Sequence, residues 1–61
     1  MTADEKRIIQ RVMKTYEREA EARRERFNRN TDRGKYMIVI AESRYEAVKA
    51  LAEELGAIDQ E

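Results

Sequence analysis

The stretch Tyr36-Met-Ile-Val-Ile-Ala41 decides which fold the sequence predicts. It has six apolar residues in a row, three of them β-branched, and no Gly, Pro or charged residue interrupts it. Such a run is typical of a β-strand. Neighbouring residues of a strand point to opposite faces, so both faces of this strand are apolar and need a cover. We therefore predict a strand over residues 36–41. A short apolar run also fits a buried helix, and the chain would then be a helical hairpin.

A long helix is predicted before the strand, from about residue 3 to residue 27. Thr2-Ala-Asp-Glu5 matches the capping box, in which the first side chain accepts from the fourth residue's amide and the fourth side chain reaches back. Ile9, Met13 and Tyr16 then recur at the spacing of one helix face, with Ile8 and Val12 flanking them. The first half of this helix therefore presents an apolar face.

A turn over residues 28–35 is predicted to follow, because Asn residues gather there and Gly34 is expected to supply a positive φ. A second helix is predicted over residues 44–55, since Ser43-Arg-Tyr-Glu46 is a second capping box. Its apolar face includes Val48, Leu51 and Leu55.

The end of the second helix is marked by Gly56, a residue suited to the left-handed position after a helix. Ala57 and Ile58 are then expected to fold back as a hydrophobic clamp. A polar tail over residues 59–61 completes the chain.

The predicted order α–β–α, in one domain spanning residues 1–61, indicates an oligomer. A chain of this length buries only about 60% of the surface that its unfolded form exposes, and it has no Cys for a disulfide. A lone strand also leaves its backbone groups unpaired. The simplest solution is a homodimer with a two-stranded antiparallel ribbon, one strand from each subunit. The predicted interface residues are Ile9, Met13, Tyr16, Tyr36, Ile38, Val39, Ile40, Val48, Leu51 and Leu55.

The composition offers little chemistry for catalysis. The chain has no His and no Cys, so imidazole and thiolate sites for zinc, copper or haem cannot form. Ser43 is the sole serine and is interpreted as a helix cap. We therefore expect no enzyme activity, no cofactor and no metal. No apolar run is long enough for a membrane helix, and a cytoplasmic protein without membrane contact is expected.

The basic segment, residues 23–35, holds six cations and two anions and has a net charge of +4, whereas residues 36–61 have a net charge of −4. Candidate anion-binding residues are Arg23, Arg26, Arg29 and Arg33. The leading hypothesis is a non-catalytic homo-oligomeric module that binds or inhibits a larger protein. One alternative is a small nucleic-acid-binding regulator that uses the basic segment. Another is an oligomer that binds a small anionic ligand at its interface.

Overall fold

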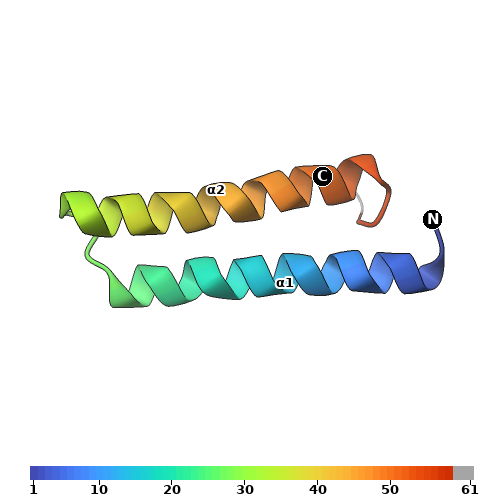
Figure 1. Cartoon of the computed structure of the whole chain (residues 1–61), viewed down its shortest axis with the longest axis horizontal. Coiled ribbons are helices and arrows are strands. Elements are labelled where there is room, and N and C mark those ends of the chain that lie inside the picture. Colours follow the sequence, from blue (N-terminus) through green and yellow to red (C-terminus); the bar gives the residue numbers. More distant parts are fainter. Residues whose placement is uncertain (59–61) are drawn as a thin grey trace.

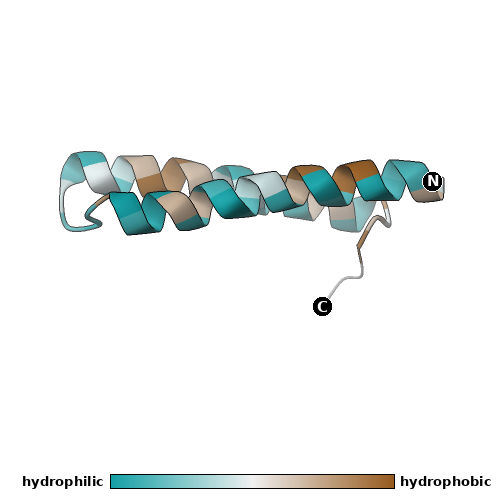
Figure 2. Ribbon diagram, turned by 90° about the horizontal axis from the view of Figure 1, so that it is seen from below, coloured by the Kyte–Doolittle hydropathy of each residue, from teal (hydrophilic) through white to brown (hydrophobic). Residues whose placement is uncertain are grey.

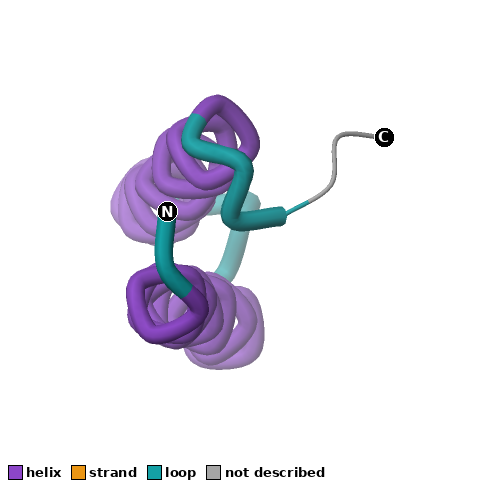
Figure 3. Tube along the Cα trace, turned by 90° about the vertical axis from the view of Figure 1, so that its right-hand side faces the viewer, coloured by secondary structure: helices purple, strands orange, loops and turns teal. Residues whose placement is uncertain are grey.

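The computed structural model describes residues 1–58, and the predicted polar tail lies outside them. The fold is a helical hairpin of α1 (Ala3–Arg26) and α2 (Asp32–Glu54). The two helices run antiparallel and side by side, joined by a short turn (Figures 1 and 3). No strand occurs within residues 1–58. The predicted α–β–α order, the strand over 36–41 and the intersubunit ribbon are therefore wrong, and the helical alternative is the observed fold.

Helix α1 begins and ends close to where the sequence predicts. The Glu5 amide donates to Thr2 Oγ1 at 3.2 Å, and the Thr2 amide donates to Glu5 Oε1 at 3.3 Å. Both halves of the predicted capping box are thus present. The helix ends at Arg26, and Phe27 is extended. The expected helix over residues 3–27 is confirmed to within one residue.

Helix α2 begins twelve residues before the predicted start, at a cap that the sequence pattern does not predict. The Gly34 amide donates to Thr31 Oγ1 at 3.0 Å, which makes Thr31 the N-cap. The Asn28 side chain accepts from the Asn30 amide at 2.8 Å and tightens the turn before it. Because Gly rather than Glu stands three residues after Thr31, the pattern of a capping box is absent. Because α2 already begins at Asp32, the turn is shorter than the predicted 28–35.

Gly34 is required for space and not for a positive φ. It is buried in the first turn of α2, and the one glycine with positive φ among the described residues is Gly56. A Cβ at Gly34 would lie 2.7 Å from the Asn28 carbonyl carbon and 2.8 Å from Thr31 Oγ1. The glycine therefore lets the incoming turn cross closely over the start of α2.

The apolar run 36–41 is helical because a helix satisfies its backbone groups within the segment. A lone strand in a single hairpin would have no ladder partner. Ile38 and Ala41 instead pack against α1 and are each 1% exposed. Ser43 consequently lies exposed inside α2 and does not cap a helix, so the predicted start at residue 44 is wrong.

The C-terminal end of α2 forms as predicted. Gly56 has φ 74° and donates to the Glu53 carbonyl at 3.1 Å, and Ala57 donates to the Ala52 carbonyl at 2.8 Å. These two bonds define a Schellman motif. Ala57 folds back and is buried, and its carbonyl accepts from Gln10 Nε2 at 2.9 Å. The end of α2 is thereby fastened to α1.

The core of the hairpin consists mainly of alanine. The buried apolar residues are Ala20, Ile38, Ala41, Ala52 and Ala57, and Ile38 is the one large side chain among the described residues that is fully buried. The molecule measures 43 × 16 × 15 Å with a radius of gyration of 13.4 Å. A compact domain of this length would have a radius of gyration of about 10.5 Å. The hairpin thus exposes an unusually large share of its surface.

Candidate functional site

An apolar surface lies at the open end of the hairpin, which is the end away from the turn (Figure 1). Here the two helices form a groove, named the open-end groove below. Its lining residues are Ile8, Ile9 and Val12 from α1 and Val48, Leu51, Ala52 and Leu55 from α2. Ile8, Leu51 and Leu55 are 59%, 57% and 56% exposed. Aliphatic side chains gathered and exposed in this way are typical of a surface that binds another molecule.

A second apolar surface lies on α2 near the turn and is named the turn-end patch. Tyr36, Val39 and Ile40 line a shallow hollow there together with Asp32 and Lys35. Tyr36 is 64% exposed and Val39 is 42% exposed. In Figure 2 the apolar bands of α1 lie in its half nearer the N-terminus, whereas the run 36–41 makes the start of α2 apolar. The two surfaces therefore lie toward opposite ends of the hairpin.

The predicted interface residues divide into two groups. Ile9, Met13, Tyr16, Ile40 and Val48 are half-buried, and Ile38 is buried within the hairpin. Tyr36, Val39, Leu51 and Leu55 are exposed. The intersubunit role of the set stays a prediction, but the position of Ile38 indicates an intrachain role.

Ile8 and Val12 also line the groove, although the sequence pattern places them only beside the apolar face. The sequence feature that could have predicted this is the pair of adjacent apolar residues at Ile8-Ile9 and again at Val12-Met13, which widens the apolar face of the helix.

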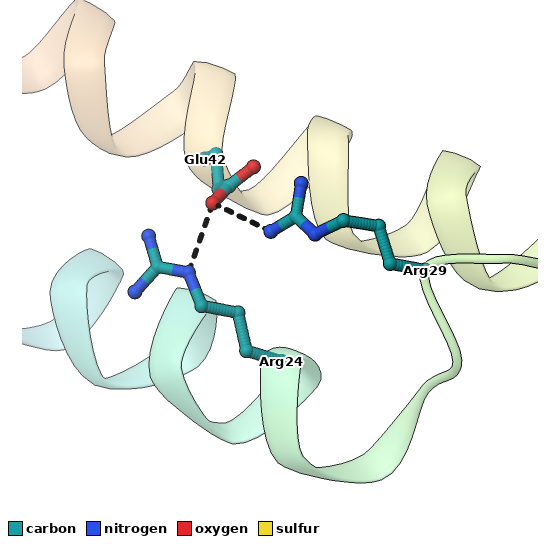
Figure 4. Close-up of polar contacts among 3 residues, drawn as sticks. All are labelled: Arg24, Arg29 and Glu42. Atoms are coloured by element: carbon teal, nitrogen blue, oxygen red, sulfur yellow. Dashed lines mark hydrogen bonds and ion pairs between the residues drawn. The ribbon is translucent and has the colours of Figure 1, made fainter.

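Two arginines of the basic segment bind one carboxylate across the hairpin (Figure 4). Arg24 Nε donates to Glu42 Oε2 at 2.9 Å, and Arg29 Nη2 donates to the same oxygen at 3.2 Å. The hydrogen bond from Arg24, followed by that from Arg29, lowers the pKa of Glu42 below its ordinary value. The pair fastens α1 and the turn to α2.

Arg23 also binds within the hairpin. Its side chain is 16% exposed, and it donates to Glu19 Oε1 and to the Met37 carbonyl, each at 2.8 Å. Arg26 lies over the Phe27 ring, with its guanidinium carbon 5.7 Å from the ring centroid.

Of the four predicted anion-binding residues, Arg23 and Arg29 thus have internal acidic partners. Arg26 and Arg33 are exposed and form no ion pair with any described residue. The cluster of four that the sequence predicts is therefore reduced to two available guanidinium groups.

Tyr45 and Glu17 form the remaining polar pair between the helices. The Tyr45 hydroxyl donates to Glu17 Oε2 at 3.1 Å. Burial, and after it the hydrogen bond to Glu17, raises the pKa of Tyr45. The pKa values of Tyr45 and Glu42 therefore both move away from neutrality, which is opposite to what general acid–base catalysis near pH 7 requires.

No cluster of three acidic residues suited to a metal ion occurs among residues 1–58. Over the same residues, neither helix is long and apolar enough to cross a membrane. Comparisons with protein-family models, curated proteins and solved structures find no match to this chain.

Proposed function

We propose that this chain is a non-catalytic helical interaction module that forms a homodimer and binds a larger protein. The observation that carries the proposal is the contrast between a core with a single large buried side chain, Ile38, and the exposed aliphatic residues of the open-end groove. Small domains without disulfides commonly reach stability by association. Each groove side chain that becomes buried contributes about 1 kcal/mol or more.

The polar pairs support a non-catalytic role. Glu42 is bound by two arginines, which makes it a weaker base, and Tyr45 donates to Glu17, which makes it a weaker acid. A catalytic group tuned for neutral pH would have its pKa shifted in the opposite direction.

A hollow on the other side of α1 supports binding of a larger protein. It is lined by Gln10, Met13, Lys14, Glu17 and Ile58. Gln10 and Lys14 each follow a groove residue by two positions, which turns them about 200° around α1. Filling the groove therefore does not by itself cover Gln10 and Lys14. The apolar floor and polar rim of the hollow resemble the composition of protein interfaces.

Sedimentation equilibrium at micromolar concentration tests the dimer. We expect twice the chain mass of 7.3 kDa for the wild type and a single chain mass for Leu51→Glu, which places a charge in the groove. A wild-type chain that is folded and monomeric at every concentration would overturn the proposal.

Affinity capture with Lys14→Glu as the control tests the larger partner. This substitution changes the rim of the hollow and leaves the groove intact. We expect one protein to be retained by the wild type and lost with Lys14→Glu, while the dimer mass is unchanged. A protein retained equally by both would contradict the assignment of the hollow.

A further inference from the structure

We propose that the open-end groove binds the turn-end patch of a second copy, so that the two hairpins pair antiparallel through α2. The inference rests on the proposed homodimer and specifies its geometry. Each copy then supplies one groove and one patch, and a twofold axis satisfies both at once.

The open-end groove and the turn-end patch are both apolar and exposed, so each can bury the other. The groove is an apolar channel between two helices, with Ile8, Leu51 and Leu55 each more than half exposed. The segment 36–41 is apolar around the whole helix, because successive residues turn about 100° around the axis. Residues Ile38 and Ala41 cover one side of that segment against α1. A helix that is apolar all round needs a cover on its remaining sides, and the groove of a second copy provides one.

The spacing along α2 supports this pairing. Tyr36, Ile40, Ala47, Leu51 and Leu55 stand at helical intervals along one side of the helix. With α2 antiparallel to its copy, and the axis between residues 45 and 46, Tyr36 lies opposite the partner's Leu55. Ile40 then lies opposite the partner's Leu51. Tyr36 and Leu55 differ by 19 in residue number and are therefore about 28 Å apart along the helix, which fits within the 43 Å length of the hairpin.

The charges of the two ends favour the same orientation. Residues 23–35 have a net charge of +4, whereas residues 36–58 have four anions and two cations. The last turn of α2 contains no basic residue and includes Glu53 and Glu54. Antiparallel pairing sets the basic turn of each copy beside this acidic end of the other and opposes the two helix dipoles. Parallel pairing would bring both basic turns together.

The size of the surface is adequate for a dimer. One broad face of the hairpin measures 43 by 16 Å. A stable interface buries about 800 Å² on each partner, which is of the same order as this face. The planar area of this face, about 690 Å², lies within the roughly 600–1,000 Å² that each partner of a standard interface buries, so the dimer would use nearly the whole face.

Cysteine crosslinking tests the orientation, since the chain has no Cys of its own. Tyr36→Cys and Leu55→Cys change exposed positions, and circular dichroism checks that both variants keep the hairpin. After mixing and mild oxidation, we expect a disulfide-linked species with one chain of each kind, at least tenfold more abundant than either self-linked species. If Leu55→Cys instead links to itself as readily, the dimer is parallel and the inference is wrong, while the proposed homodimer stands. A monomeric mass for the wild type would overturn both.

A charge exchange provides an independent test. Arg33 and Glu54 are exposed and lie at opposite ends of α2, so they do not interact within one chain. Arg33→Glu and Glu54→Arg should each weaken dimerisation about threefold or more, and the double variant should restore it. The matched control exchanges Arg18 and Glu46, which are exposed and lie outside the stripe, residues 23–35 and the last turn of α2, and should have little effect. Absence of rescue in the double variant would contradict the antiparallel arrangement.

Discussion

The turn half and the open half of the hairpin are held together by different contacts. In the turn half, Ile38 is fully buried, Arg23 binds the Met37 carbonyl, and Glu42 binds two arginines. In the open half, a hydrogen bond from Gln10 to the Ala57 carbonyl joins the helices, and Ala52 and Ala57 are buried while the aliphatic side chains around them remain half exposed. Directional polar contacts and one well-packed side chain thus close the turn half within a single chain. We expect the stability of the open half to depend on what fills its groove.

The largest difference between the halves should appear on truncation of one aliphatic residue in each. Ile38→Ala removes the single large buried side chain and should lower the free energy of unfolding by about 3 kcal/mol, or unfold the chain. Leu51→Ala truncates a residue that is 57% exposed and should cost about 1 kcal/mol in the isolated hairpin. Urea unfolding at low protein concentration measures both. Equal costs would show that the two halves are packed alike.

The two glycines offer a sharper comparison, because Gly34 is required for space in the turn half whereas Gly56 is required for its positive φ in the open half. Gly34→Ala should cost about 2–3 kcal/mol, since its Cβ meets the Asn28 backbone. Gly56→Ala has open space around it and should cost about 1 kcal/mol, through its positive φ alone.

Asn separates the two causes, because it tolerates a left-handed backbone but needs more room than Ala. In thermal melting, Gly56→Asn should therefore be nearly neutral, whereas Gly34→Asn should be as destabilising as Gly34→Ala. Equal effects of Asn at the two positions would contradict this account.

Capping distinguishes the true start of α2 from the start that the sequence predicts. Thr31→Ala removes the acceptor of the Gly34 amide and should cost about 1 kcal/mol. Ser43→Ala changes an exposed residue inside the helix and should be neutral, or stabilising by up to about 0.5 kcal/mol. Chemical denaturation of both variants measures the difference. A larger cost at Ser43 would place the helix start there instead.

The smallest effect should be a pH dependence confined to the turn half. The arginines lower the pKa of Glu42 in the folded chain. The contribution of Glu42 to the free energy of unfolding is therefore complete at a pH above 4.5, the ordinary pKa of this carboxyl, and is lost as the pH falls through the lowered pKa. Melting temperature from pH 6 to pH 2 should therefore fall less steeply for Glu42→Gln than for the wild type. Glu25→Gln, an exposed carboxylate without a described ion pair, serves as the control and should follow the wild type.

Local signals predicted those parts of the fold that short-range hydrogen bonds define. The Thr2–Glu5 capping box fixed the start of α1, and Gly56 with Ala57 fixed the end of α2. Thr31 was missed because a cap with Gly at its third following position has no distinctive pattern. The candidate site was found in part. The predicted interface residues include four that line the groove, namely Ile9, Val48, Leu51 and Leu55, whereas Ile8 and Val12 joined them only through the packing of α1 on α2.

The sequence by itself determined that residues 36–41 would be apolar on every side, and that such a segment would need cover from more than one direction. Whether that segment is a strand or a helix was decided only by tertiary structure. Six consecutive apolar residues are compatible with a strand or with a helix, and the free energy that favours one of the two comes from the surface against which they pack. Here α1 offers Ile38 and Ala41 a helical partner, and no second strand exists among the described residues to complete a ladder. A helix, whose backbone hydrogen bonds are internal, is then the conformation that leaves no amide unpaired.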